Sequence, residues 1–363
     1  MRAGWPGAPS SFELSPLGAT PYKRAMIQKI TRMAVLALLA CTPARADEQV
    51  TIRVSAYLSP LSHSVKTIIS PWMERVREAS GGRIDFETYW GGSLGRNPYK
   101  QYDIVKAGIT EVGLVQPSYA PGQFPQMQAF ELPFRVRSST EASLVAWRLH
   151  ERGLLTGFED VKLLGMWTAE PSNLFTRGDV RSYEDINGLK IRSAGRLEGD
   201  FLTRLGAVPE SLHPADAVEA LRRGTIDGAV QGWIAINTFQ TYRETDYVIT
   251  APLGAVTFSL LMNKAKWDSL PPDLQQIIDA NSGDVIALIG GRSYDAMQRE
   301  ISARLKAEGH LQFIEADPDK VDEMQTYVQP IADAWAERTP GGLETLEAIK
   351  DILADLRRRE RQS

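Results

Sequence analysis

The most constraining feature of the sequence is the stretch 186–233, which reads INGLKIRSAGRLEGDFLTRLGAVPESLHPADAVEALRRGTIDGAVQGW. Leu189–Ile191 predicts a short strand, and the residues that follow it predict a helix ending at Gly206. A second helix is expected from about Ala215 to Arg223, and the residues from Ile226 onward enter another strand. Strands that alternate with helices in this way indicate an α/β fold.

Arg192 directly follows the first of these strands. In open α/β sheets, ligands bind at the carboxyl ends of the strands. An arginine at that place presents a planar fork of donors that matches a carboxylate. Arg192 is therefore the first candidate for binding an anionic ligand, and an ordinary surface arginine is the alternative.

The remainder of the chain continues the pattern, and its first part has the order strand, helix, strand, helix, strand, which implies parallel strands with helical crossovers. The expected strands are Val50–Tyr57, Arg83–Trp90, Glu111–Gln116, Leu163–Thr168, Val256–Asn263 and Leu311–Ile314. The expected helices are Ser64–Ala79, Pro98–Gly108, Ser139–Arg152, Asp319–Glu337 and Leu343–Arg358. A long helical run over 272–307, interrupted by Gly283 and Gly290–Gly291, is expected to span two lobes.

The amino-terminal segment 1–46 has the features of a leader, with Met26 as the expected true start of translation. Two basic residues precede the apolar run Met33–Cys41, and Ala44–Ala46 is an A-x-A cleavage signature. This succession predicts a secretory signal peptide, because the apolar run is too short to span a bilayer. A lipobox ending at Cys41 is the rival interpretation.

The charge of the chain after this leader excludes some partners. Residues 47–363 hold 35 basic and 44 acidic side chains, a net charge of −9, so nucleic acid and anionic membranes are poor partners. Cys41, the only cysteine, lies in the leader, and disulfides are not expected after it. No cofactor and no metal site are expected, because phosphate-binding glycine motifs are absent and the four histidines lack metal-ligand spacing.

Four pieces of sequence in a fixed order resemble the substrate-binding proteins of TRAP transporters, the tripartite ATP-independent periplasmic transporters. The pieces are Gly188–Arg192, Leu205–Pro209, Ala220–Gly224 and Ile226–Gly228. Gly108–Gly113 and Leu132–Phe134 resemble further short motifs of the same family.

The resemblance implies an α/β periplasmic binding protein with two lobes, of the Venus-flytrap kind, and a long helix that spans both. We expect 47–170 and 256–297 in lobe I, 171–255 and 298–350 in lobe II, and 351–363 as the carboxyl-terminal tail, which frays from Arg357 onward. The implied function is capture of an organic acid in the periplasm by hinge closure. Delivery to a TRAP membrane permease is implied as well, and the protein is expected to be a monomer and not an enzyme.

The resemblance also implies that Arg192 pairs with the carboxylate of the ligand. Gln231 and Trp233 follow the strand that begins near Ile226 and are expected to face the cleft, although Trp233 could equally pack between the lobes. Members of the family that carry a second arginine have it about twenty residues before the first, where this chain has Ser172. The candidates from lobe I are Tyr57, His63, Gln116, Ser118, Tyr119 and Trp167.

Glu170 precedes the expected crossing between the lobes. It could select a ligand with a positive or hydroxyl group, but a solvent-facing turn residue is the more ordinary interpretation. Arg177 and Arg196 are close to Arg192 in sequence, and nothing in the pattern fixes their direction.

Two other classes of function stay open at this point. Gly91–Gly95 matches the G-x-S-x-G elbow of serine hydrolases, with Ser93 as the nucleophile. Against it, Ser93 comes too early after the leader, and the expected helix begins only at Pro98. A periplasmic ligand sensor for a membrane kinase would have the same sequence features as a transport protein.

Overall fold

The computed structural model describes residues 49–315 and 318–362. The chain divides into two units, and the second, Gln49–Ser363, is compact and holds every described element. The predicted signal peptide, with Met26, Cys41 and the A-x-A signature, lies outside the described residues. Among the described residues, no helix is long and apolar enough to cross a membrane.

The first sheet has five strands in the order β2-β1-β3-β10-β4. The strands are β1 Val50–Ser55, β2 Ile84–Tyr89, β3 Val112–Val115, β4 Val161–Thr168 and β10 Thr257–Asn263. β1 pairs parallel with β2 and with β3, which confirms the parallel arrangement expected for this part of the chain. β10 returns from much later in the sequence and lies antiparallel between β3 and β4.

The second sheet has six strands in the order β11-β9-β5-β8-β6-β7. They are β5 Asn173–Thr176, β6 Lys190–Ser193, β7 Val208–Ser211, β8 Gly228–Gln231, β9 Tyr247–Thr250 and β11 Gln312–Glu315. β6 is parallel to both β7 and β8, and the residue next to the end of β6 is Arg192. The chain passes from the first sheet to the second between β4 and β5, although the lobe boundaries expected from the sequence stay predictions.

Helices cover both sheets. The α-helices of the described residues are α2 Ser70–Ala79, α3 Gln101–Lys106, α4 Ser139–Glu151, α5 Arg196–Arg204, α6 Pro214–Arg222, α7 Trp233–Thr238, α8 Lys264–Ser269, α9 Pro272–Ala280, α10 Asp284–Glu308, α11 Pro318–Arg338 and α12 Gly342–Glu360. The turn before α2, Val65–Ile69, is π-helical, and the turn before α3, Pro98–Lys100, is a 3-10 helix. Ser138 caps α4 by accepting a hydrogen bond from the amide of Glu141, which explains why this helix begins where it does.

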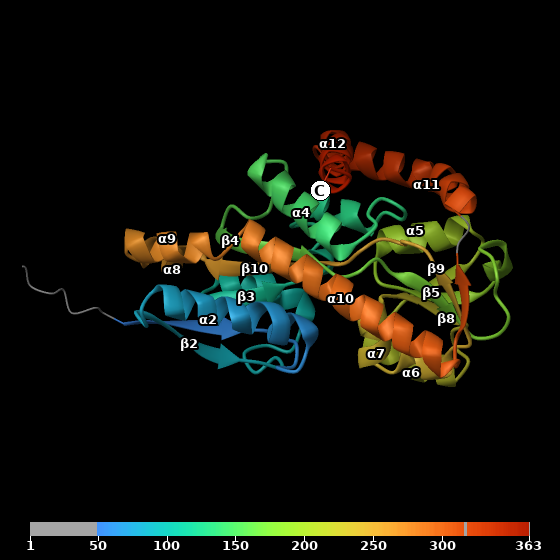
Figure 1. The fold of residues 1–363 in the computed structure, drawn as a ribbon, viewed down its shortest axis with the longest axis horizontal. Coiled ribbons are helices and arrows are strands. Elements are labelled where there is room, and N and C mark those ends of the chain that lie inside the picture. Colours follow the sequence, from blue (N-terminus) through green and yellow to red (C-terminus); the bar gives the residue numbers. More distant parts are fainter. Residues whose placement is uncertain (1–48, 316–317, 363) are drawn as a thin grey trace, which may run out of the picture. The chain divides into compact units, whose positions relative to one another are not determined.

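The long helical run over 272–307 forms two helices with a break at 281–283. α10 is the long helix expected to span both sheets, and Figure 1 shows it crossing from β10 to α7. Its first half packs with the core of the first sheet through Ile286 and Tyr294. Its second half packs with the core of the second sheet through Ile301 and Leu305.

Gly290 and Gly291 do not interrupt α10, contrary to the expectation from the sequence. A Cβ atom at Gly290 would lie 2.5 Å from the Cβ of Trp167, and one at Gly291 would lie 2.4 Å from the Cα of Thr140. The two glycines therefore let α10 lie directly against β4 and α4.

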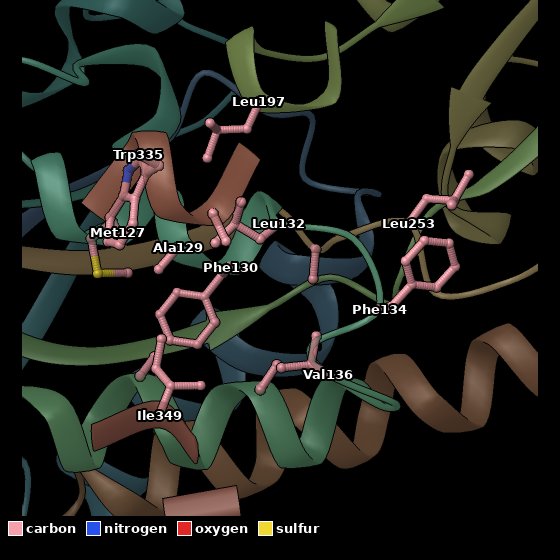
Figure 2. Packing of buried hydrophobic residues seen from close by; sticks show 14 of the residues in the cluster. Met127, Ala129, Phe130, Leu132, Phe134, Val136, Leu197, Leu253, Trp335 and Ile349 are labelled. Atoms are coloured by element: carbon pink, nitrogen blue, oxygen red, sulfur yellow. The ribbon is translucent and has the colours of Figure 1, made fainter. Parts of the chain in front are cut away.

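A large apolar cluster joins the segment Pro125–Glu131 to the carboxyl-terminal helices. Figure 2 shows Met127 and Phe130 beside Trp335 of α11 and Ile349 of α12, with Leu197 of α5 near them. The indole of Trp335 is fully buried. The cluster therefore fixes the last two helices against the body of the protein.

The carboxyl-terminal helix α12 confirms the helix expected over Leu343–Arg358, and it continues to Glu360, into the segment 357–363 that was expected to fray. Ile352 and Leu353 of α12 are buried against the rest of the cluster. Arg357 donates to both carboxylate oxygens of Glu141 on α4, with Nη2 at 3.0 Å from Oε2.

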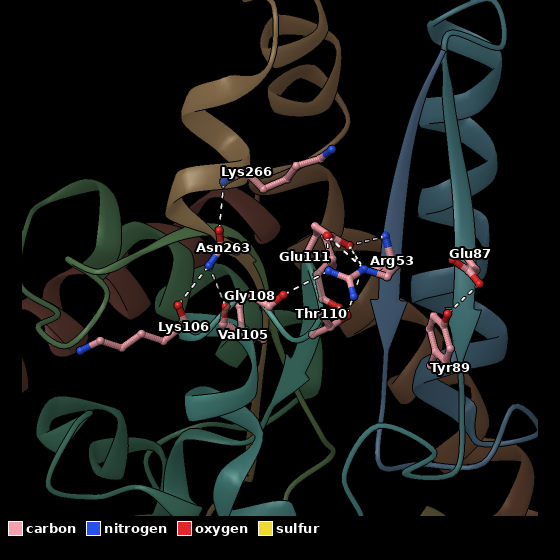
Figure 3. A network of polar contacts seen from close by, with 11 residues as sticks. Arg53, Glu87, Tyr89, Val105, Lys106, Gly108, Thr110, Glu111, Asn263 and Lys266 are labelled. Atoms are coloured by element: carbon pink, nitrogen blue, oxygen red, sulfur yellow. Dashed lines mark hydrogen bonds and ion pairs between the residues drawn. The ribbon is translucent and has the colours of Figure 1, made fainter.

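A network of hydrogen bonds and ion pairs connects the strands of the first sheet at the end where β10 finishes (Figure 3). Arg53 of β1 donates through Nε to Glu111 at 2.8 Å and through Nη2 to the carbonyl of Gly108 at 3.1 Å. Asn263 at the end of β10 donates to the carbonyls of Val105 and Lys106. These bonds hold the strands in register, so that their opposite ends can form a site.

Candidate ligand-binding site

The ends of the strands from both sheets surround a cavity of about 190 Å³. This volume is enough for a small ring compound, since about 150 Å³ suffices to hold benzene. Of the residues expected to bind ligand, the lining includes Tyr57, His63, Gln116, Tyr119, Ser172, Arg192 and Gln231. Ser118, Trp167 and Trp233 are not among the lining residues.

Arg192 is the positively charged group of the cavity. It is only 4% exposed, because β7 and β8 flank its strand on both sides. Its Nε donates to the carbonyl of Leu212 at 2.9 Å, and its Nη1 donates to the carbonyl of Val230 at 2.7 Å. These two bonds fix the plane of the guanidinium.

The guanidinium of Arg192 is incompletely paired. Within residues 49–315 and 318–362, nothing accepts a hydrogen bond from its Nη2, and no acidic side chain forms a salt bridge with it. Burial lowers its pKa, and the nearby carboxyl of Glu198 acts in the opposite direction. A buried cation without a full set of partners is costly, so an anion placed at Nη2 would stabilise it.

Gln231 is a second group with unused hydrogen-bonding capacity. The side chain lies at the end of β8 and is 2% exposed. Neither its Oε1 nor its Nε2 has a hydrogen-bond partner among the described residues. Most buried polar groups are hydrogen-bonded, so an unpaired amide in a cavity wall indicates a place for polar atoms of a ligand.

Glu170 corrects the expectation of a solvent-facing turn residue, because it is 2% exposed and lines the cavity. Its Oε1 accepts a hydrogen bond from the amide of Ile234 at 2.7 Å. Its Oε2 is buried and has no partner among the residues that the structure describes. Burial raises the pKa of this carboxyl to about 7.

The residues after β1 and β3 form a short chain of hydrogen bonds. Tyr57 donates its hydroxyl to Oε1 of Gln116 at 3.0 Å, and Nε2 of Gln116 donates to Ser118 at 3.0 Å. Ser118 therefore orients Gln116 from behind rather than facing the cavity. Tyr119 lines the cavity and its ring packs against Tyr99, with 4.7 Å between the ring centroids.

His63 lies where the first sheet meets α10. Its Nε2 is 3.1 Å from the hydroxyl of Ser293, and its ring is edge-on to Tyr294 at 4.6 Å. Burial lowers the pKa of His63, which favours the neutral imidazole. The ring is therefore a wall of the cavity rather than a second cation.

The two tryptophans expected near the ligand are core residues. Trp167 is fully buried, stacks on Phe258 and donates to Ser64 at 3.3 Å. Trp233 packs between Phe175 and Phe313, with ring centroids at 5.1 and 5.4 Å. Both tryptophans support residues of the wall from outside.

Several lining residues have no signal in the sequence. Phe258 and Tyr294 reach the cavity from elements that come late in the chain, β10 and α10. His213 also lines the cavity, and its place before Pro214 at the start of α6 indicates a helix cap from the sequence. Its Nδ1 accepts from the amide of Ala215 at 3.2 Å.

Other basic residues near Arg192 in sequence point elsewhere. Arg177 donates to the carbonyl of Leu221, and Arg196 is exposed and lies 3.9 Å from Asp200. Ser172, at the place of the second arginine of other family members, lines the cavity. Among the described lining residues, Arg192 is thus the single arginine or lysine.

The hydrolase alternative lacks structural support. Ser93 is exposed in a turn and does not line the cavity. No helix follows it directly, since the 3-10 helix begins at Pro98. No group of His, Cys, Asp and Glu within the described residues could hold a metal ion.

A family model for bacterial extracellular solute-binding proteins, family 7, matches residues 54–339. A curated relative is the C4-dicarboxylate-binding periplasmic protein DctP of Rhodobacter capsulatus, 23% identical over 92% of this chain and 99% of the relative.

Two solved structures are also similar, both with a TM-score of 0.77. One is a TRAP solute binding protein from Rhodoferax ferrireducens T118 with copurified benzoate, 29% identical over 85% of this chain and 98% of that one. The other, from a marine metagenome, is specific for aromatic acid ligands and holds 3-hydroxybenzoate, at 26% identity and the same coverage. This likeness confirms the α/β fold of two lobes.

Proposed function

Because this chain belongs to the bacterial extracellular solute-binding proteins of family 7, the solute-binding family of TRAP transporters, we propose that it captures an organic acid at Arg192 for a TRAP membrane permease. The family and the structural neighbours are substrate-binding proteins and not enzymes. The family is also extracytoplasmic. The leader predicted in residues 1–46 agrees with a periplasmic location.

The observation that carries this proposal is the incomplete pairing of Arg192. A ligand carboxylate would accept hydrogen bonds from Nη2 and complete the set that the carbonyls of Leu212 and Val230 begin. Exclusion of water from the cavity would strengthen this attraction, because the effective dielectric constant falls. The ligand would stabilise a closed state only to the extent that it binds that state better than an open one.

An aromatic acid is the class that the walls favour. Phe239, Phe258, Ile234 and Tyr294 provide apolar surface around the polar groups. Two relatives with similar structures hold benzoate and 3-hydroxybenzoate, and another relative is named for C4-dicarboxylates. The presence of a single guanidinium in the lining favours an acid with one carboxylate over one with two.

Thermal-shift and calorimetric titrations of residues 47–363 against monocarboxylic aromatic acids and C4-dicarboxylates would test the proposal. A ligand of the native state raises the melting temperature. Arg192→Ala is expected to weaken binding by about 2–5 kcal/mol, the usual effect of truncating one member of a buried charge pair. Arg196→Ala, which removes an exposed arginine, is the matched control and should leave affinity unchanged.

Loss of binding counts only if the Arg192→Ala protein keeps its circular dichroism spectrum and cooperative melting. Unchanged affinity in a folded Arg192→Ala protein would remove Arg192 as the carboxylate anchor. Absence of binding by every acid to the unmodified protein would contradict the organic-acid function itself.

A further inference from the structure

Three polar groups are arranged in order along β8 and the turn after it. Arg192 is bonded to the carbonyl of Val230, Gln231 follows with its amide unpaired, and Glu170 lies against Gly232. A strand advances by about 3.3 Å per residue, so the places next to Val230 and Gly232 are roughly 6–7 Å apart. The cavity is thus lined by a cationic group beside Val230 and by a carboxyl group beside Gly232, two residues further along the chain.

The backbone near Gly232 fixes the position of the Glu170 carboxyl. A Cβ atom at Gly232 would lie 2.4 Å from Oε1 of Glu170, so only glycine permits this approach. The amide of Ile234 binds the same oxygen. These contacts hold the carboxyl group in one orientation. Its other oxygen, Oε2, is left without a partner among the described residues.

Glu170 is not a counter-ion for any described basic group. No described lysine or arginine forms a salt bridge with it, and the charged side chain whose field it feels is Asp295 of α10. Asp295 is itself occupied, because it accepts hydrogen bonds from the amides of Ser139 and Thr140. Tyr294, beside it on α10, donates to or accepts from Ser64. No described protein group therefore compensates Oε2.

We propose that Glu170 selects organic acids that carry a hydrogen-bond donor, a hydroxyl or ammonium group, on the side of the molecule opposite the carboxylate held by Arg192. Gln231 binds the polar atoms between these two ends. This inference rests on the proposed function, since it assumes that Arg192 anchors a carboxylate.

The chemistry of the carboxyl explains the preference for a donor. An ionised carboxylate only accepts hydrogen bonds; when Glu170 is protonated, Oε1 still accepts from Ile234 and Oε2 carries the proton, so Oε2 becomes a donor that a hydroxyl can accept from. A ligand hydroxyl satisfies Oε2 in both states, and a ligand ammonium does so with the ionised state. An apolar ring edge leaves Oε2 unpaired, and a second ligand carboxylate is repelled by the ionised form. Sites built to bind a polar substituent discriminate strongly against analogues that lack it.

Calorimetric titration with matched ligands tests this selection. The probes are benzoate, 3-hydroxybenzoate, 4-hydroxybenzoate, 4-(aminomethyl)benzoate and terephthalate. For the unmodified protein, at least one hydroxyl or ammonium acid should bind tenfold or more tightly than benzoate, and terephthalate should bind more weakly than benzoate. The better of the hydroxyl and ammonium probes identifies the donor that the site takes.

Two variants separate the role of Glu170 from its effect on folding. Glu170→Met keeps a side chain of similar length without hydrogen-bonding oxygens, and the ratio of affinities between donor-bearing acid and benzoate should fall to about one. Glu170→Gln should keep most of a preference for hydroxyl and lose any preference for ammonium. Both ratios are measured within one variant, so partial unfolding affects numerator and denominator alike.

The outcomes distinguish this inference from the proposed function. If the ratio of affinities between donor-bearing acid and benzoate is the same in Glu170→Met and in the unmodified protein, the role of Glu170 is overturned. Loss of benzoate binding in Arg192→Ala would still support the organic-acid function in that case. A preference of the unmodified protein for benzoate over every donor-bearing acid would also overturn the role of Glu170. If none of the five acids binds the unmodified protein, the proposed function fails first.

Discussion

At the scale of single residues, the side chains that would serve a ligand are the ones left unsatisfied by the protein. Gln126 and Gln231 are both buried glutamines, with 3% and 2% of their surfaces exposed. Gln126 accepts hydrogen bonds from Thr156 and donates to the carbonyl of Pro340, whereas the amide of Gln231 has no described partner. The difference indicates that Gln126 serves the fold and Gln231 serves binding.

Replacing each of these glutamines by methionine is expected to have opposite effects on the ligand-free protein. Gln231→Met should raise the free energy of unfolding by about 1–2 kcal/mol, because an unpaired buried amide is removed. Gln126→Met should lower it by about 1–3 kcal/mol, because partners are left unpaired. Chemical denaturation measures both, and a lower stability for Gln231→Met would show that its amide is satisfied in the free protein.

The candidate site could be predicted only in part from individual residues. Arg192 and Gln231 were expected to face the cavity, and both line it, because they lie at or next to the ends of strands whose direction could be predicted. Trp167 and Trp233 were candidates for the cleft with core packing as the alternative, and both are in the core, since a strand-end aromatic gives no indication of which side it faces. Glu170 was placed in solvent because its burial depends on Gly232 and Ile234, which are far away in the sequence.

At the scale of elements, close contact between α10 and its neighbours depends on small residues at the point of crossing. Gly291→Ala should lower the free energy of unfolding by about 1–3 kcal/mol, because its Cβ would overlap the backbone of Thr140. Gly199→Ala in α5 is the control, since the nearest atom to its Cβ would be 3.6 Å away, an ordinary contact. That change should be neutral or stabilise by up to about 1 kcal/mol, as alanine favours helices.

Thermal or chemical denaturation of both alanine variants measures this contrast. Equal stability changes in the two helices would mean that α10 can shift away from α4 without loss. The free energies must be compared in the absence of ligand, because binding near α10 would add to the stability of either variant.

Elements were predictable where they are long or lie within a recognisable motif. The strands β1, β2, β4 and β10 and the helix α4 were expected within a few residues, because each has a clear periodicity or cap. β5 and β9 have four residues each, too few to show alternation, and they lack the flanking motifs that indicated other strands of the same length, such as β6 and β8. Gly290 and Gly291 suggested an interruption, but packing against β4 and α4 stabilises the helix through them.

At the scale of the whole molecule, the two-lobed class could be predicted from the sequence, because the order of elements and the spacing of four motifs relate residues that are far apart along the chain. The pattern could not predict the cavity, since its walls combine the ends of strands from both sheets with α10. Glu170 lines this cavity, whereas Glu131 and Glu198 line a smaller hollow that shares Ser172, Ala194 and Val256 with it. The pKa of Glu131 is raised to about 8, and those of Glu170 and Glu198 to about 7, in each case mainly by loss of hydration.

These three carboxyls predict a dependence of stability on pH. Each binds a proton more tightly in the folded chain than in the unfolded chain, whose glutamates titrate at about 4.3. Their contribution to stability is therefore complete below pH 4.3 and is lost as the pH rises through 7 to 8. Burial lowers the pKa values of His63, His150 and His213, which gives an opposite slope near pH 6. The carboxyl contribution must therefore be isolated by comparison with a variant.

The comparison is between the unmodified protein and the triple variant Glu131→Gln, Glu170→Gln, Glu198→Gln, each unfolded by urea without ligand at pH 5 and pH 8. The unmodified protein should lose more stability over this interval than the triple variant, by several kcal/mol, up to about 9 kcal/mol if the three carboxyls titrate independently. Glutamine substitution of the exposed residues Glu78, Glu300 and Glu347 is the control and should leave the slope unchanged. An identical slope in the triple variant would mean that these carboxyls are hydrated in solution when no ligand is bound.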